Sequence, residues 1–283
     1  MTISILLPTR KRVLQLEKTM DSLLSNAKHP DKIQPIFGVD DDDPETLEFL
    51  KDKNYKNQSV LKFKRLGYEN LHIYNNSLCA YAQGTWIMFF NDDAIMSTKH
   101  WDEKIEAVKG FKVLRMKEQT GHPYSIFPIF PYDWFRLLDH ISLHGQNDAW
   151  ISEIAYMLDI MEDIDIEAIH DRADITGNNN DEVFNERVYN EGNPKDPKDL
   201  HHNDMWNKRV ADASKLAWYL ERIGQKSLHW QKIVRKEINP MDKLADKFDA
   251  YRKAGAIGIG KQNARTSDQR EIKVSYTAVP TDT

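Results

Sequence analysis

The chain has 283 residues, of which 40% are hydrophobic and 29% are charged, and this composition excludes a disordered or collagen-like protein. Its 39 lysines and arginines are outnumbered by 44 aspartates and glutamates, and the resulting net charge of −5 argues against a protein that binds nucleic acid through its charge. The one cysteine, Cys79, excludes an internal disulfide framework and any multi-cysteine metal centre.

The sequence contains no pattern that predicts a membrane span or a secretion signal. The longest apolar run, Trp86–Phe90, is far shorter than the ~20 residues that cross a bilayer. At the N-terminus the apolar residues 3–7 precede the basic residues 10–12, which is the reverse of the order in a secretory signal. We therefore expect no transmembrane segment and a cytoplasmic protein.

The first part of the chain alternates short apolar runs with segments of helical period. Strands are predicted over residues 3–7, 33–39, 61–63 and 86–90. Helices are predicted over about residues 12–27, from Asp43-Pro44 onward, and over 71–82, which Gly84 is placed to end. This alternation predicts an α/β fold with a mostly parallel sheet flanked by helices.

The pattern is less regular from about Val113 onward. Strands are expected over residues 125–130 and 164–169, and a helix over about 148–160. Residues 177–204 are rich in Asn, Asp, Pro and Gly, and they predict a long loop. Helices follow from Trp206 and from Asn239, the last ending at Gly255. We expect three parts: a catalytic domain over 1–185, a helical C-terminal extension over 186–255 and a flexible tail over 256–283.

Polar residues follow three of the predicted strands. Pro8-Thr9-Arg10 ends the first, a run of four aspartates from Asp40 ends the second, and Asn91-Asp92-Asp93 ends the strand at 86–90. The carboxyl ends of parallel strands meet at one edge of a sheet, where ligands bind. Crowded carboxylates repel one another unless a cation lies among them, so Mg²⁺ or Mn²⁺ is expected. Such an ion commonly bridges two phosphates, which indicates a nucleoside diphosphate.

These segments resemble the GT-A-fold glycosyltransferases, particularly the family-2-like group. Residues 3–12 look like the opening strand and nucleotide loop of that group, and residues 38–40 look like its second strand. Residues 82–93 look like its helix, glycine, strand and "DXD" signature. The resemblance covers roughly residues 1–185. It implies a GT-A-type, Rossmann-like fold and a hexosyltransferase-like activity.

The resemblance also implies roles for individual residues. The residues that would contact the nucleoside are Pro8, Thr9, Arg10 and Asp40. Asp92 and Asp93 would serve the ribose and the metal-bound diphosphate, with Asp93 as the metal ligand. Asn91 stands where many members have an aspartate; its amide can still hydrogen-bond a ribose, but it lowers the charge around the ion.

Two later segments complete the expected site. An inverting transferase needs a carboxylate that takes the proton from the acceptor hydroxyl. In the family that the chain resembles, this carboxylate stands at the start of a helix after the metal-binding strand. The segment that matches this helix start contains Asp148, the candidate base, with Glu153 as the second choice. His170 and Arg172 follow the strand expected at 164–169. By resemblance to some GT-A enzymes, His170 would bind the metal and Arg172 would neutralise the leaving diphosphate.

Each of these residues also has a purely structural interpretation. Asp43 is a helix cap because Pro44 follows it, and Asp148 could be an ordinary N-cap. Asp92 and Asp93 could form a turn after a buried strand, and Arg10 belongs to a basic trio that could face water. His170 and Arg172 could lie in a surface loop.

The leading hypothesis is an inverting, metal-assisted transfer of a sugar from a nucleotide-diphosphate sugar to a glycan or other hydroxyl acceptor. A sugar nucleotidyltransferase is less well supported because residues 8–12 contain no glycine for a phosphate loop. A non-catalytic nucleotide-binding protein on the same fold is favoured only by Asn91. The aromatic-rich helices from Trp206 onward are expected to pack on the main domain, and self-association through them is an alternative.

Overall fold

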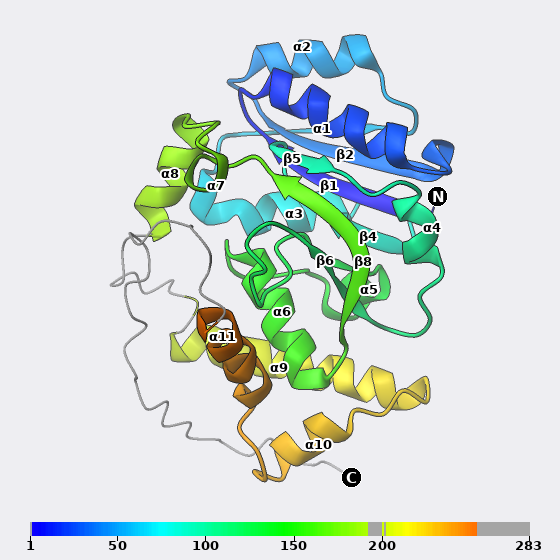
Figure 1. Ribbon diagram of the computed structural model, residues 1–283, viewed down its shortest axis with the longest axis vertical. Coiled ribbons are helices and arrows are strands. Elements are labelled where there is room, and N and C mark those ends of the chain that lie inside the picture. The colour runs from blue at the N-terminus through cyan, green and yellow to red at the C-terminus, as the bar shows by residue number, and fades with distance from the viewer. Residues whose placement is uncertain (1, 192–199, 201, 254–283) are drawn as a thin grey trace.

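The computed structural model describes residues 2–191, 200 and 202–253 (Figure 1). The expected tail over 256–283 and the helix end expected at Gly255 lie outside these residues. Within them, eight strands form one sheet: β1 Ile3–Thr9, β2 Ile33–Asp40, β3 Ser59–Phe63, β4 Trp86–Phe89, β5 Ala94–Met96, β6 Val113–Lys117, β7 Ile129–Pro131 and β8 Met161–His170. The helices are α1 Val13–Asn26, α2 Pro44–Lys53, α3 Leu71–Cys79, α4 Trp101–Glu106, α5 Asp133–Leu138, α6 Asn147–Leu158, α7 Ala173–Thr176, α8 Glu182–Glu191, α9 Asn203–Arg222, α10 Leu228–Val234 and α11 Asp242–Lys253.

The sheet has the strand order β3-β2-β1-β4-β7-β6-β8-β5. β1 pairs in parallel with β2 and β4, β2 with β3, and β6 with β8. The short strands β7 and β5 are antiparallel to their neighbours. The prediction of an α/β fold with a mostly parallel sheet flanked by helices is therefore confirmed.

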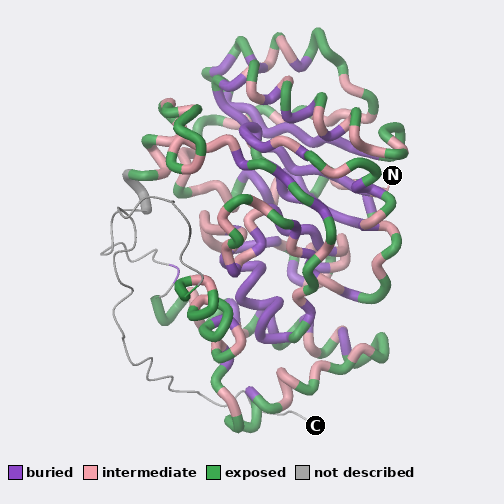
Figure 2. The backbone as a smooth tube through the Cα atoms, viewed as in Figure 1, coloured by how far each residue is buried: buried purple, intermediate pink, exposed green. Residues whose placement is uncertain are grey.

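The central strands are buried along most of their length (Figure 2). Their residues enter two separate cores alternately, one on each face of the sheet. Ile5 and Leu7 pack with α1, α2 and α4, whereas Leu6 packs with α3, α5 and α6. Burial on both faces explains why β1 is an almost continuous apolar run. The carboxyl ends of β1, β2 and β4 are thereby held at one edge of the sheet.

The C-terminal helices extend the core that contains Leu6, α3, α5 and α6. α9 packs against α5 and α6, and α10 also packs against α6. Ala213, Leu216 and Leu220 of α9 lie in the same apolar cluster as Trp150 of α6. The division at residues 185 and 186 stays a prediction, and α8 runs across it. None of the helices within the described ranges combines the length and apolar character needed to cross a bilayer.

Two sequence-based predictions of local structure are wrong. α3 ends at Cys79 rather than at Gly84. A Cβ at Gly84 would lie 2.5 Å from the backbone nitrogen of Ser4, so Gly84 is required by the close passage of the chain against β1. The loop predicted over 177–204 contains α8, whose first turn begins with a hydrogen bond from the Phe184 amide to Asp181. The polar composition of the segment hid this helix.

Candidate active site

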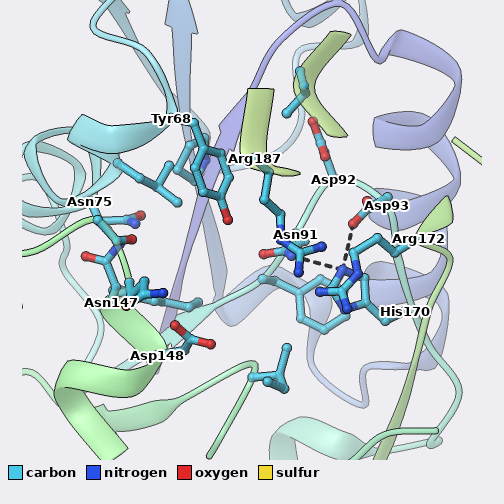
Figure 3. A pocket seen from close by; sticks show the side chains of 18 of the residues that line it. Tyr68, Asn75, Asn91, Asp92, Asp93, Asn147, Asp148, His170, Arg172 and Arg187 are labelled. Atoms are coloured by element: carbon cyan, nitrogen blue, oxygen red, sulfur yellow. Dashed lines mark hydrogen bonds and ion pairs between the residues drawn. The ribbon is translucent and has the colours of Figure 1, made fainter. Parts of the chain in front are cut away.

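A cavity of about 560 Å³ lies at the carboxyl ends of β1 and β4, between these strands, α3, the start of α6, the end of β8 and α8 (Figure 3). Its size is typical of small-molecule sites. Nine of the ten predicted site residues line it: Pro8, Thr9, Arg10, Asn91, Asp92, Asp93, Asp148, His170 and Arg172. Figure 3 shows Asp93, His170 and Arg172 on one side of the cavity and Asp148 across from them.

The turn after β4 buries two neighbouring carboxylates. Asp92 and Asp93 are each only 5% exposed. Asp92 Oδ2 accepts a hydrogen bond from Thr9 Oγ1 at 2.8 Å, and Asp92 Oδ1 lies 2.9 Å from Arg12 Nη1. The same Arg12 nitrogen is 3.1 Å from Asp93 Oδ2. Arg12 thus supplies a positive charge of the protein between the two carboxylates, and the divalent ion expected there stays a prediction.

Sequence reasoning did not single out Arg12. Its Nε and Nη2 donate to the carboxylate of Asp181, at 2.6 and 2.8 Å, so one guanidinium joins three acids. Burial alone would lower the pKa of Arg12, but the charge of Asp92 and the hydrogen bonds to Asp181 outweigh it and raise this pKa. Because Asp181 is 169 residues away, no local pattern could have identified the contact.

His170 completes the acidic side of the cavity. The antiparallel pairing of β5 with β8 places it opposite Ala94, next to the turn that carries Asp93. His170 Nε2 lies 3.2 Å from Asp93 Oδ1 and 3.1 Å from Asn91 Nδ2. One ring nitrogen cannot donate to Asp93 and accept from Asn91 at the same time. Asp93 Oδ1 is therefore a buried oxygen without a well-formed hydrogen bond.

The pKa values of the two neighbouring acids are shifted in opposite directions. Burial acts to raise the pKa of Asp93, but the close contact with His170 at 3.2 Å together with the charge of Arg12 outweighs burial and lowers this pKa. Burial raises the pKa of Asp92 despite the charge of Arg12. Asp93 is consequently the more strongly ionised of the two carboxyls.

The side chains of Asp93 and His170 fit a divalent ion that binds together with a phosphate group of the substrate. Asp93 Oδ1 and His170 Nε2 face each other, and the carboxylate oxygen has no competing partner of good geometry. No cluster of three or more His, Cys, Asp or Glu suited to a metal occurs among the described residues. Asp93 and His170 are therefore the two candidate ligands here, and Mg²⁺-type ions commonly complete such sites with substrate phosphates and water.

Arg10 is fixed by carboxylates rather than exposed to water. It is 8% exposed, and its guanidinium bonds Asp40, at 3.1 Å from Nη1 to Oδ2, and Asp42, at 3.0 Å from Nη2 to Oδ2. The other oxygen of Asp40 accepts from the hydroxyl of Tyr74. Asp40 is the one predicted site residue that does not line the cavity. The interpretation of Asp43 as a helix cap is confirmed, because it accepts from the Thr46 amide.

The two candidate bases occupy different environments. Asp148, in the first turn of α6, is half-buried and lines the cavity. Glu153 is completely buried, pairs with Arg209 and accepts a hydrogen bond from Tyr124 at 2.9 Å. Glu153 is not among the residues that line the cavity, so Asp148 is the only one of the two that a substrate there would contact.

Arg172 lines the cavity as predicted, and its Nη2 donates a hydrogen bond to Asp174 at 2.9 Å.

Several other cavity residues were not predicted from the sequence. α8 contributes further lining residues, and the misassigned loop concealed them: Val183, Phe184, Glu186 and Arg187. Asn75 of α3 and Asn147 of α6 also line the cavity. Nothing in their local sequence distinguishes them from ordinary helix residues.

Comparison with known proteins agrees with the resemblance drawn from the sequence. Residues 4–115 match the family model described as "Glycosyl transferase family 2". A search of curated proteins gives no match. The mannosyltransferase PcManGT from Pyrobaculum calidifontis, solved with GDP-Man and Mn²⁺, is 11% identical, with a TM-score of 0.50 over 90% of this chain and 86% of that one. S. aureus TarS 1–349, solved with UDP-GlcNAc, is 13% identical, with a TM-score of 0.50 over 90% and 81%.

The GT-A fold and the family-2-like sequence pattern of residues 4–115 are thereby confirmed. At these identities the two solved structures establish the fold alone.

Proposed function

We propose that the protein is a glycosyltransferase that moves one sugar from a nucleotide-diphosphate sugar to a hydroxyl group of a glycan or other acceptor, with inversion. The observation that carries this proposal is the single cavity that holds Asp93, His170 and Arg172 across from Asp148. Groups suited to a diphosphate and a group suited to remove a proton are thus separated by the space that a sugar would fill. The family-model match supports the same class.

The nucleoside would lie against the carboxyl end of β1. Pro8 and Thr9 line the cavity there, and Arg10 is held rigidly by Asp40 and Asp42. We propose that Asp40 acts on the nucleoside through Arg10 and that Asn91 and Asp92 serve the ribose. Fixed side chains lose little conformational entropy when a ligand binds, and this favours affinity.

The leaving diphosphate would lie beside Asp93, His170 and Arg172. Asp93 and His170 would hold Mn²⁺ or Mg²⁺, and the ion, when bound, would offset the charge that develops on the diphosphate. Arg172 adds a positive charge of the protein on the same side. The complexes of PcManGT with GDP-Man and Mn²⁺ and of TarS with UDP-GlcNAc support this class of donor.

Asp148 would act as the general base. Its carboxylate would take the proton from the acceptor hydroxyl while that oxygen forms the new bond to the anomeric carbon. The bond from the anomeric carbon to the diphosphate oxygen breaks in the same step, and the electron pair leaves with the nucleoside diphosphate. Attack from the Asp148 side, opposite the diphosphate, would invert the anomeric centre.

Thermal unfolding in the presence of UDP or GDP, with and without Mn²⁺, tests the donor site. A ligand that binds only the folded state raises the Tm, by an amount that grows with its concentration relative to Kd. We expect a metal-dependent increase with one nucleotide, and its loss in Asp93→Ala. Asp52→Ala, a change of an exposed acid on α2, is the matched control. No increase with either nucleotide would contradict the proposal.

Turnover is tested separately. We expect release of the nucleoside diphosphate from the matching nucleotide sugar, even by slow hydrolysis without an acceptor. Nucleotide binding with no release of any kind would favour a non-catalytic nucleotide-binding protein instead.

A further inference from the structure

Asn75 is a mostly buried residue whose amide has no hydrogen-bond partner in the part of the chain that the structure describes. It lies on α3 and is 4% exposed, and its side chain lines the cavity. It forms no side-chain hydrogen bond with any residue that the structure describes, whereas its neighbours on both sides are bonded. Tyr74 donates to Asp40, and the amide oxygen of Asn76 accepts from the Ile141 amide at 2.7 Å. Because Asn75 lines the cavity and no described residue takes up its amide, both of its donors and its acceptor are available to a ligand in the cavity.

Asn147 presents a second unsatisfied amide to the same cavity. It is the first residue of α6 and is 3% exposed. Its Nδ2 donates to the carbonyl of Gly145 at 2.8 Å, but its Oδ1 is buried and has no hydrogen-bond partner. Figure 3 shows Asn75 and Asn147 on the same side of the cavity, away from Asp93 and His170.

The chemistry of these side chains indicates the group that they bind. A carboxamide offers two donors and one acceptor and carries no charge. It suits a hydroxyl or acetamido group, whereas phosphate is bound more strongly by the arginines across the cavity. Asn147 directly precedes Asp148, the proposed base. The part of a donor that lies between its diphosphate and the base is the sugar that is transferred.

We propose that Asn75 and Asn147 bind the transferred sugar of the donor through its neutral hydroxyl or acetamido groups and thereby select the donor. The inference rests on the proposed function, because it requires a nucleotide sugar in this cavity. A polar site built to hydrogen-bond a substrate group discriminates strongly against a molecule that lacks the group, since the buried amides are then left unpaired.

If Asn75 binds the sugar, replacing it should affect ligand binding and protein stability differently. An asparagine that is buried for structural reasons loses hydrogen bonds when it is replaced, and the protein is destabilised. Asn75 has no such bonds among the described residues, so Asn75→Ala removes an unpaired polar group and leaves the Tm unchanged or higher. The same substitution weakens sugar binding. A purely structural role predicts the opposite result for both measurements.

Titration calorimetry without an acceptor provides the test. The wild-type protein, Asn75→Ala and Asn75→Asp are titrated with UDP, GDP, UDP-glucose, UDP-GlcNAc and GDP-mannose in the presence of Mn²⁺. We expect both variants to bind the preferred nucleotide sugar at least about tenfold more weakly and to bind its free nucleoside diphosphate as the wild type does. Ile73→Ala, a change on the exposed face of α3, is the control and should match the wild type in every titration.

Equal losses for the nucleotide sugar and the free nucleotide would overturn the inference and assign Asn75 to the nucleoside. Unchanged affinities, or a lower Tm in Asn75→Ala, would overturn it in favour of a structural role. In these cases the proposed function stands, because the wild type still binds a nucleotide sugar. A wild-type protein that binds none of the five ligands overturns the proposed function and this inference together.

Discussion

Arg209 Nε lies 2.7 Å from Glu153 Oε2, and both side chains are almost completely buried. The guanidinium of Arg209 also faces the rings of Trp150 and Trp206, and its Nη1 donates to the Leu200 carbonyl at 2.7 Å. This pair joins α9 to α6 behind the wall of the cavity. Glu153 is therefore a structural counter-ion, although its position in the sequence made it a candidate base.

Removing one partner of this pair should destabilise the protein strongly. Glu153→Ala leaves the buried guanidinium of Arg209 without its carboxylate, and such changes cost about 3–5 kcal/mol. Urea unfolding monitored by tryptophan fluorescence measures the loss. Ser214→Ala, a change on the exposed face of α9, is the control. A Glu153→Ala protein of normal stability without turnover would restore Glu153 as a candidate base.

Asp148→Asn should reduce turnover without weakening donor binding. The amide preserves the size of the side chain but cannot accept the acceptor proton, and loss of a general base typically lowers kcat by about 10²–10⁴. The two quantities to compare are kcat under saturating donor and acceptor and the Kd of the donor measured by calorimetry. Near-normal kcat together with normal donor binding would exclude Asp148 as the base.

Replacing Arg12 should destabilise the fold even though Arg12 lies in the candidate site. Arg12→Met leaves Asp92 and Asp93 buried beside each other without their guanidinium, and Asp181 loses a two-point contact. We expect a loss of about 3–5 kcal/mol in urea unfolding.

Arg12→Lys should restore little of this stability, because one ammonium group cannot reproduce the planar fork that joins three acids. If Arg12→Lys were as stable as the wild type, a single point charge would suffice and the geometry of the fork would be unimportant.

His122 should make stability depend on pH. Burial lowers the pKa of His122 to about 4, compared with ~6.5 in the unfolded chain. The folded state therefore excludes a proton that the unfolded state binds. The resulting contribution is fully present above pH ~6.5 and is lost as the pH falls toward about 4; it amounts to at most about 3 kcal/mol.

The measurement is the free energy of unfolding between pH 8 and pH 4.5 for the wild type and for His122→Asn, which retains an acceptor for the Tyr124 amide. The variant should lose less stability on acidification. Identical pH dependence in both proteins would show that other groups cause the effect.

The parts of the fold that follow from local sequence were predictable. β1 and β4 are apolar runs ended by polar residues, and the helical period of α1 is evident from the spacing of Leu16, Met20 and Leu23. The cap at Asp43 follows from the proline after it. These features depend on neighbouring residues only, and each agrees with the structure.

The remaining features depend on distant contacts. Arg12 meets Asp181 across 169 positions, and the strand pairing that brings His170 to Asp93 joins separate parts of the chain. Gly84 was assigned to a helix end because a glycine commonly stands there, whereas the steric reason is a strand 80 positions earlier. The unpaired amide of Asn75 becomes apparent only when all of its neighbours are known.

The positions of the site residues along the chain also determine when the site can form as the chain is synthesised. The carboxylates of Asp92 and Asp93 emerge from the ribosome well after Arg12 but long before His170 and Asp181. A growing chain can therefore neutralise the two acids with Arg12 as soon as β4 pairs with β1, whereas the remaining contacts wait for β8 and α8. Because N-terminal segments fold first during translation, Arg12 would be the charged partner of both acids in this period, with Thr9 donating to Asp92. Early contact with Arg12 would reduce the repulsion between these two neighbouring carboxylates while the rest of the chain is still being made.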